Sequence, residues 1–318
     1  MDLILAAAGL VLLLLAGDVL VRGAVALSLR LGIPALVVSL TIVAFGTSAP
    51  ELLIAVQAVL EDAPGIAFGN VVGSNIANIL LVLGVPAILT PILTKEFETS
   101  RTYYMMIGAT ILFILLCFFG PLRWWHGIVM LLVLFYVLHD AYRTAKEARG
   151  ERGGGDLDLE ELEDADPDMP RWKIALFIVL GLLGLPSGAN LLIDGARGIA
   201  LELGVSEAVI GLTLVAIGTS LPELATTVMA TLRKQADVVL GNVIGSNLFN
   251  LLAIMGIASM FGSLPVPKGF LEVDLWVMLG SSLLIVPFVL HWSNITRRWG
   301  FALVGLYALY VGVILTTH

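Results

Sequence analysis

The sequence predicts an all-α polytopic membrane protein with ten transmembrane helices, arranged as two inverted five-helix repeats with a broken helix in each. Composition is the first reason. Of the 318 residues 58% are hydrophobic and only 13% charged, and the mean hydropathy is +0.99, far from a typical soluble domain. The second reason is that apolar runs of about 20 residues, enough to cross ~30 Å of hydrocarbon as a helix, recur along the chain. The third is a long internal repeat.

The predicted spans follow one another closely, apart from one long charged segment in the middle. They cover residues 2–20, 34–60, 66–90, 103–120, 124–142, 172–193, 206–232, 237–260, 273–291 and 299–316. No basic residues precede the first run and no convincing cleavage site follows it, so it is predicted to be a retained helix and not a signal peptide. The chain is therefore divided into a first repeat at 1–142, an acidic cytoplasmic linker at 143–171 and a second repeat at 172–318.

The internal repeat relates residues 39–84 to residues 211–256. At a constant offset of 172 and without gaps, 22 of the 46 aligned pairs are identical, which is most simply explained by a duplication. Matching spans lie five spans apart, and an odd number of crossings reverses the direction of a helix in the membrane. The repeats are therefore predicted to be inverted, an arrangement that places ion sites near the midplane, between the two halves.

The charges of the loops agree with this inversion. The acidic pair Glu61–Asp62 aligns with the basic pair Arg233–Lys234, so a loop on one side matches a loop of opposite charge on the other. All but three of the 17 lysines and arginines fall on one side of the ten-span arrangement; the exceptions are Arg123, Arg197 and Lys268. Because short basic loops face the cytoplasm, we expect a multi-pass protein of the cell (inner) membrane with both termini outside.

Each repeat interrupts a helix with the motif Gly-Thr-Ser-x-Pro-Glu. Pro50 and Pro222 have no N–H to donate to the carbonyl four residues earlier, so carbonyl oxygens become available inside the membrane. Backbone of this kind is tolerated at such depth only when it is buried in protein or lines a watery cavity. The motif ends in Glu51 and Glu223. An ionisable group in the middle of a span is costly and indicates a functional site.

Oxygen-bearing side chains accompany each glutamate. Thr47 and Ser48 lie four and three positions before Glu51, on the same helix face, and the second repeat has the same spacing. The next helix carries Gly-Asn-Val-x-Gly-Ser-Asn-x-x-Asn, which puts Ser74 and Asn78 on one face; the glycines of this motif are better explained by helix packing. Carboxylate, hydroxyl, amide and carbonyl oxygens without histidine or cysteine favour sodium, calcium or another hard cation. Two ionised glutamates would be neutralised by one calcium.

At these duplicated motifs the sequence resembles the cation/calcium exchanger superfamily, and within it the sodium/calcium exchangers. The resemblance spans the ten-helix architecture and implies antiport by alternating access, with calcium extruded as sodium enters. For a site with two ionised glutamates, exchange of about three sodium ions for one calcium would move net charge. The resemblance implies that the glutamates and the two threonine carbonyls bind calcium, that alanine and serine positions bind sodium, and that two asparagines line the middle. The implied ligands are Glu51, Glu223, Thr47, Thr219, Ser48, Ser220, Ala44, Ala216, Ser74, Ser246, Asn78 and Asn250.

The resemblance also carries finer expectations. In related exchangers the first and sixth helices slide together across the bundle. Some relatives, including the potassium-dependent ones, have aspartate where this chain has Asn250, which weakens the case for potassium transport. No cofactor is expected beyond the transported sodium and calcium ions, and the chain is expected to function as a monomer in the lipid bilayer, with no nucleic acid as partner.

Three other functions fit part of the pattern. A proton/calcium exchanger is the nearest alternative, although such proteins more often have Gly-Asn-Ala-x-Glu where this chain keeps Thr-Ser-x-Pro-Glu twice. A passive cation channel could also use carboxylates and carbonyls, but duplicated broken helices favour alternating access. An enzyme is disfavoured because His126, His139, His291 and His318 lie away from the motifs.

The acidic linker lacks the spaced ligands of an EF-hand, so it is interpreted as solvated.

Overall fold

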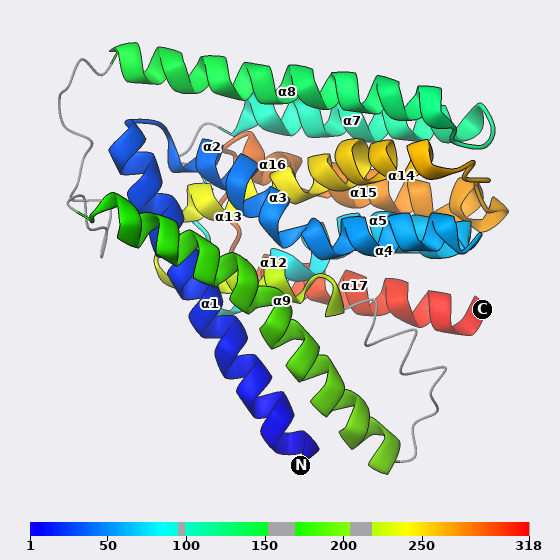
Figure 1. Cartoon of the computed structure of the whole chain (residues 1–318), viewed down its shortest axis with the longest axis horizontal. Helices are drawn as coiled ribbons and strands as arrows, with labels where there is room; N and C mark the ends of the chain where they lie inside the picture. The colour runs from blue at the N-terminus through cyan, green and yellow to red at the C-terminus, as the bar shows by residue number, and fades with distance from the viewer. Residues whose placement is uncertain (95–98, 152–168, 204–217, 318) are drawn as a thin grey trace.

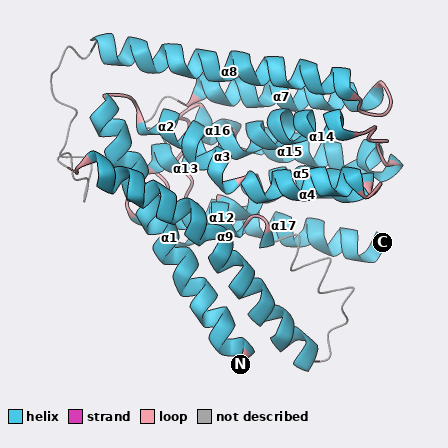
Figure 2. Ribbon diagram, in the orientation of Figure 1, coloured by secondary structure: helices cyan, strands magenta, loops and turns pink. Residues whose placement is uncertain are grey.

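The computed structural model describes residues 1–94, 99–151, 169–203 and 218–317. Regular structure in these ranges is helical (Figure 2), and their only strand-like pairings are isolated bridges between Ile92 and Ile295 and between Leu122 and Leu264. This confirms the predicted all-α class. It also follows from the environment, because only helices and closed barrels satisfy all backbone groups within a bilayer.

The helices of the first half alternate between long spans and short broken segments. They are α1 (Asp2–Leu31), α2 (Ala35–Val38), the π-helix η1 (Ser39–Val43), α3 (Ala44–Thr47), α4 (Ala49–Leu60), α5 (Pro64–Ala77), the π-helix η2 (Asn78–Val82), α6 (Gly84–Leu89), α7 (Ser100–Phe118) and α8 (Trp124–Glu151).

The described helices of the second half follow the same order. They are α9 (Arg171–Glu202), α12 (Leu221–Leu232), α13 (Ala236–Leu248), the π-helix η6 (Phe249–Ile254), α14 (Met255–Phe261), the π-helix η7 (Phe270–Asp274), α15 (Leu275–Leu284), α16 (Val286–Val289) and α17 (Arg297–Thr317).

The described residues contain seven helices long and apolar enough to cross a membrane, and an eighth span if the bent pair Ala35–Thr47 and Ala49–Leu60 is counted as one. The two remaining predicted spans also coincide with helix. Residues 299–316 lie in α17, and the end of 206–232 forms α12, whereas 204–217 lie outside the described residues. The structure is therefore that of a polytopic membrane protein.

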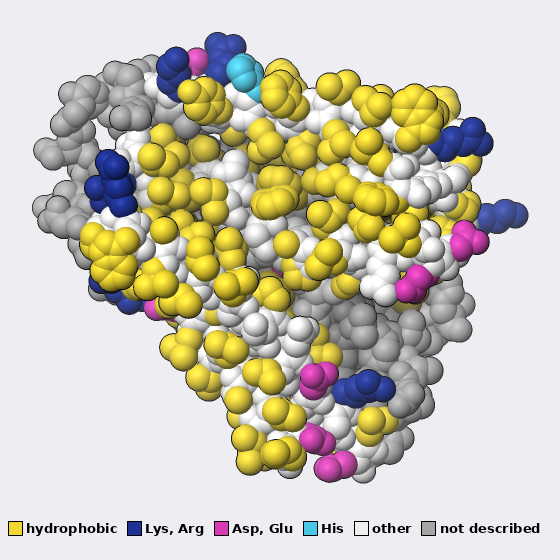
Figure 3. All heavy atoms as spheres, viewed as in Figure 1, with side chains coloured by type: hydrophobic (Ala, Val, Ile, Leu, Met, Phe, Trp, Pro, Cys, Tyr) yellow, Lys and Arg dark blue, Asp and Glu magenta, His cyan; other side chains and the backbone are white. Residues whose placement is uncertain are grey.

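The surface has the apolar belt expected of such a protein. Figure 3 shows hydrophobic side chains covering the middle of one face, while lysine, arginine and acidic side chains gather at its edges and lower tip. Large apolar side chains such as Leu53 and Phe135 are about 70% exposed. An exposed apolar surface this extensive is typical of contact with lipid.

Helices α1 and α9 form an antiparallel pair that slopes away from the other helices (Figure 1). Glycines allow their backbones to approach closely: a Cβ added at Gly188 would lie 2.8 Å from the Leu13 nitrogen and 3.1 Å from the Gly9 carbonyl oxygen. Small residues are a common means of packing helices in membranes. The antiparallel direction of two helices at matching positions of the repeat agrees with the predicted inversion.

Three predicted helix ends were too early. The first span was expected to end at residue 20 and the sixth at 193, yet α1 continues to Leu31 and α9 to Glu202. Within α1 the Arg22 guanidinium lies 5.5 Å from the centroid of the Phe177 ring of α9, so the neighbouring helix accommodates a charge just beyond the predicted end of the span. Likewise α8 runs past residue 142 to Glu151, and the acidic residues 152–168 of the predicted linker lie outside the described residues.

The backbone repeats its geometry in the two halves. Asp62 and Lys234, which are related by the offset of 172, both have φ of 55° in the turn after the broken helix. The residue before that helix is Ser48 in one half, with φ −86° and ψ 6°, and Ser220 in the other, with φ −88° and ψ 2°. The same local fold is therefore built twice, although the charges of the turns are opposite.

Candidate cation-binding site

The two helix breaks place both glutamates at helix N-termini. Helix α3 ends at Thr47, Ser48 leaves the helical conformation, and α4 starts with proline in its first turn, which bends the chain by 44°. Helix α12 begins in the same way after Ser220. Glu51 and Glu223 lie in the first turns of α4 and α12, where the positive end of the helix dipole stabilises a carboxylate. The break therefore orients each carboxylate and lowers the cost of its charge.

Side chains of the two halves meet between these breaks. The Ser48 hydroxyl of the first half donates to Glu223 Oε1 of the second at 3.2 Å, and the hydroxyls of Ser74 and Thr219 lie 3.5 Å apart. Glu51 and Glu223 are both 1% exposed. Two buried carboxylates at the contact between the halves favour a bound cation, because an unpaired buried charge is costly.

Several buried polar atoms around the glutamates have no hydrogen-bond partner. Such groups are rare in proteins, and a bound hard cation would satisfy the oxygen atoms among them. In the described residues they include Glu51 Oε2, Glu223 Oε2, Ser220 Oγ, Ser246 Oγ, Asn78 Oδ1, and both Nδ2 and Oδ1 of Asn250. All but one of these atoms are oxygens, so the donor set suits a hard cation.

The two predicted asparagines both lie in π-helical turns. Asn78 is the first residue of η2 and donates through Nδ2 to Asn247 Oδ1 at 3.1 Å, another hydrogen bond between the halves. Asn250 lies within η6 at the matching position of the second half. A π-helical turn widens the backbone locally and often marks a functional site. The sequence motif did not indicate these turns.

A second pair of asparagines supports the broken helices, and the sequence reasoning did not single it out. Asn70 Nδ2 donates to the Glu51 carbonyl at 3.0 Å, and Asn242 Nδ2 donates to the Glu223 carbonyl at 3.4 Å and to Thr227 Oγ1 at 3.1 Å. These amides tie α5 to α4 and α13 to α12 directly behind the carboxylates. Their occurrence at matching positions of the two motifs was the signal that could have identified them.

Of the two predicted alanine positions, Ala44 lies within the described residues and Ala216 does not. Ala44 is buried, and its carbonyl accepts from the Ser48 N–H at 3.1 Å and from the Thr47 hydroxyl at 3.2 Å. Both lone pairs of that oxygen are therefore engaged in this conformation, and an ion would have to compete for them. Ala216, its counterpart, lies outside the described residues. Its role stays a prediction.

The described part of the site has no cluster of the side chains that typically bind transition metals. The described residues contain no group of three or more histidine, cysteine, aspartate or glutamate side chains placed to hold a metal ion. The site consists of two carboxylates with hydroxyl, amide and carbonyl oxygens around them, which suits sodium or calcium and is poorly suited to zinc or copper.

Fold and site together define an all-helical polytopic membrane transporter with oxygen-bearing side chains where its two halves meet. The chain belongs to the sodium/calcium exchanger protein family, whose model matches residues 1–139 and 173–316. It is therefore a cation/calcium antiporter and not an enzyme. The unmatched residues 140–172 cover the predicted linker.

Curated relatives and solved structures of this family match most of the chain. A putative antiporter, CaxA, from Alkalimonas amylolytica is 36% identical over 91% of this chain and 90% of its own. The sodium/calcium exchanger MaX1 from Methanosarcina acetivorans is 32% identical over 96% of both. The solved sodium/calcium exchanger from Methanococcus jannaschii superposes with a TM-score of 0.82 at 32% identity, covering 98% of this chain and 97% of that one.

Proposed function

We propose that the protein exchanges sodium for calcium at one site shared by its two halves, which opens alternately to either side of the membrane. The observation that supports this most is the pair of buried glutamates from opposite halves, surrounded by oxygen atoms without hydrogen-bond partners. The Methanococcus jannaschii exchanger, which shares this fold, was solved in crystals soaked with sodium and strontium or with sodium and calcium. Divalent and monovalent cations would compete for the same carboxylates.

The proposed stoichiometry is about three sodium ions per calcium, because the carboxylate pair carries two negative charges and the further sodium ions would use neutral oxygens. Such an exchange moves one net positive charge per cycle. When calcium enters a vesicle and sodium leaves it, an inside-positive potential should therefore speed uptake. Each elementary charge moved across 100 mV corresponds to about 2.3 kcal/mol, so an imposed potassium diffusion potential gives a sensitive test.

A calcium-flux experiment tests the proposal. Purified protein in sodium-loaded liposomes should take up calcium when external sodium is replaced by choline, and Glu51→Gln or Glu223→Gln should abolish that uptake. Glu61→Gln serves as the matched control, since Glu61 lies in the exposed turn of the same half. Uptake by the unsubstituted protein that ignores the sodium gradient would reject sodium coupling.

The proton/calcium exchanger remains the rival within the family. In the same liposomes it would take up calcium in response to a pH gradient with sodium absent. The duplicated Thr-Ser-x-Pro-Glu motif favours sodium, because its hydroxyls add neutral oxygen ligands that a protonated carboxylate would not need. Calcium uptake driven by the pH gradient alone would assign the protein to the rival class.

A further inference from the structure

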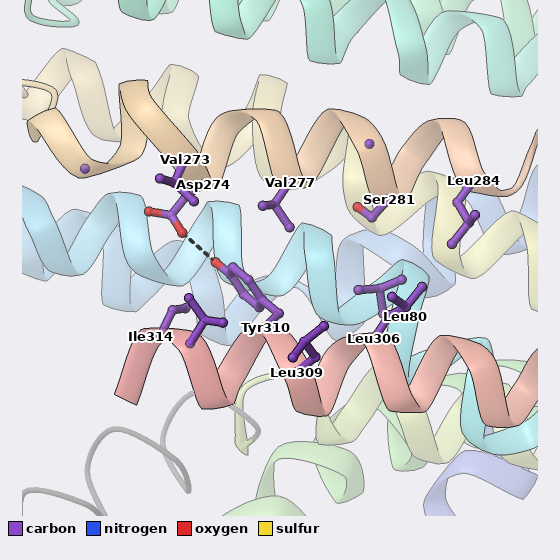
Figure 4. A pocket seen from close by; sticks show the side chains of 13 residues that line it. Leu80, Val273, Asp274, Val277, Ser281, Leu284, Leu306, Leu309, Tyr310 and Ile314 are labelled. Carbon is purple, nitrogen blue, oxygen red and sulfur yellow. Dashed lines mark hydrogen bonds between the residues drawn. The ribbon is translucent and has the colours of Figure 1, made fainter. Parts of the chain in front are cut away.

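A cavity of about 610 Å³ lies between α15 and α17, and none of the predicted cation ligands lines it (Figure 4). Its walls are almost entirely aliphatic. It exists partly because two of its lining residues are glycines: a Cβ added at Gly269 or Gly280 would meet no atom within 4 Å. Its volume is within the range of small-molecule sites, and its walls belong to helices that face the bilayer.

One end of this cavity holds a polar pair. Figure 4 shows Asp274 and Tyr310 facing each other across it, with the Tyr310 hydroxyl donating to Asp274 Oδ1 at 2.9 Å. Asp274 is half-buried and has no ion-pair partner among the described residues. The carboxylate is at the last residue of η7, which continues directly into α15, and the cavity extends from it along the aliphatic wall towards Ser281 and Leu284.

We infer that this cavity binds one phospholipid with a primary ammonium headgroup, such as phosphatidylethanolamine. An acyl chain would lie along the aliphatic wall, and the ammonium group would pair with the Asp274 carboxylate. A carboxylate that accepts one hydrogen bond from a phenol still has acceptor capacity for an N–H donor, and a charge-assisted bond of this kind is the stronger type. Lys268 is an exposed cation that immediately precedes the lining residue Gly269, and we expect it to pair with the lipid phosphate.

A metal ion fits this cavity less well than the lipid. Calcium takes six to eight oxygen ligands, whereas a single carboxylate, a phenol and Ser281 are the polar side chains that line the described walls. Leu80, which also lines the cavity, belongs to the π-helix η2 that begins at Asn78. An acyl chain in the cavity would thus pack against the turn that carries one of the site asparagines.

Lipid retention measured by native mass spectrometry tests the headgroup. Delipidated protein is mixed with dioleoyl phosphatidylethanolamine or dioleoyl phosphatidylcholine, which share acyl chains but differ in N–H donors. We expect one phosphatidylethanolamine molecule to be retained in preference to phosphatidylcholine. Asp274→Asn should reduce that preference about tenfold, as expected for loss of a hydrogen bond to a charged group. Glu272→Gln, an exposed acid of η7 that does not line the cavity, should leave it unchanged. Equal retention of both lipids, or no effect of Asp274→Asn, would overturn the headgroup assignment.

Filling the cavity tests its location. Gly280→Leu should abolish retention of either lipid, whereas Gly305→Leu, at an open position of α17 outside the lining, should not. An unchanged melting temperature confirms folding, and Gly280→Ala offers a smaller step if the leucine is not tolerated. Retention that survives Gly280→Leu would place the lipid elsewhere. A dimer that this substitution dissociates would assign the cavity to a second copy and reject the lipid. These readouts require no transport, so they stand apart from the proposed sodium–calcium exchange.

Discussion

The buried oxygens around the two glutamates are not equivalent, and their differences lead to residue-scale predictions. Ser48 uses its hydroxyl to bond Glu223, whereas the matching hydroxyl of Ser220 is buried without a partner. An unsatisfied buried hydroxyl destabilises the ion-free protein by about 1–3 kcal/mol. We propose that the second hydroxyl is a ligand of the transported ion.

The first prediction compares the two serines. Ser48→Ala should lower the stability of ion-free protein by about 1.5–3 kcal/mol, because it removes a bond to a charged group, while Ser220→Ala should leave it unchanged or raise it. Both should weaken stabilisation by added sodium. Thermal unfolding in detergent, with choline replacing sodium as the reference, measures both effects. An equal loss of ion-free stability in the two variants would contradict this account.

The second prediction concerns the asparagines behind the carboxylates. Asn242 makes two hydrogen bonds and Asn70 one, so Asn242→Ala should cost about 1 kcal/mol more than Asn70→Ala. Both should also slow calcium flux, because the first turn carrying each glutamate loses its support. Gln57→Ala, which removes an exposed amide bonded to Glu61, is the control and should change neither. Thermal unfolding and liposome flux provide the two measurements.

The sequence predicted the site unevenly for reasons visible in single residues. Glu51 and Glu223 were identifiable because a charge within an apolar run needs a specific explanation. Asn70 and Asn242 were overlooked because their hydrogen bonds go to backbone carbonyls of another helix, a partner that sequence spacing does not reveal. Whether Ala44 binds an ion depends on competition for its carbonyl, which no pattern of residues predicts.

At the scale of elements, α1 and α9 pack closely on each other and also share a buried cluster with Val43 and with Ala225 of α12. Their contact is made by backbone against backbone at glycines, while α1 is joined to the turn after α12 by the ion pair between Asp18 and Arg233, with N···O 2.6 Å. We propose that this helix pair moves as one body against the remaining helices during transport. Close packing within the pair is then a condition for the movement.

The third prediction tests that condition. Gly188→Leu should separate α1 from α9 and reduce calcium flux at least about tenfold, since a Cβ at this position already approaches the Leu13 nitrogen too closely. Gly108→Leu places the same side chain at a position in α7 where a Cβ meets nothing within 4 Å, and flux should be retained. Size-exclusion chromatography establishes that both variants are folded. Normal flux in folded Gly188→Leu would refute the coupled movement.

Element boundaries were predicted less well than element identity. Hydropathy falls at Asp18 and Arg22, so the predicted span ends at residue 20. Asp18 instead forms an ion pair with Arg233, Arg22 lies over the Phe177 ring, and α1 continues to Leu31. The π-helices η2 and η6 were not predicted either. A π turn depends on how neighbouring helices pack, and the residues within it do not encode it separately.

At the scale of the whole molecule, the inverted repeat was predictable because the two copies retain similar motifs while their turns exchange charge. Asp62 and Lys234 occupy the same backbone conformation, with φ of 55° in both, in turns that the positive-inside rule assigns to opposite sides. The extent of the linker was less predictable, because α8 continues into it as far as Glu151.

The fourth prediction uses this pair to test the orientation. The single cysteine, Cys117, is buried and is replaced by alanine to give a cysteine-free background. In intact cells, Asp62→Cys should react with a membrane-impermeant maleimide, whereas Lys234→Cys should react only after the membrane is permeabilised. The reverse pattern would invert the proposed topology, and labelling of both from outside would contradict the inverted repeat.

The central claim is that the two halves build one calcium site and not two. Equilibrium binding of radioactive calcium to purified protein without sodium tests it most directly. The account predicts one calcium per chain, displaced by sodium, and complete loss of that binding in either Glu51→Gln or Glu223→Gln, because both carboxylates serve the same ion. Two calcium ions per chain, or retention of half the binding in each single variant, would contradict it.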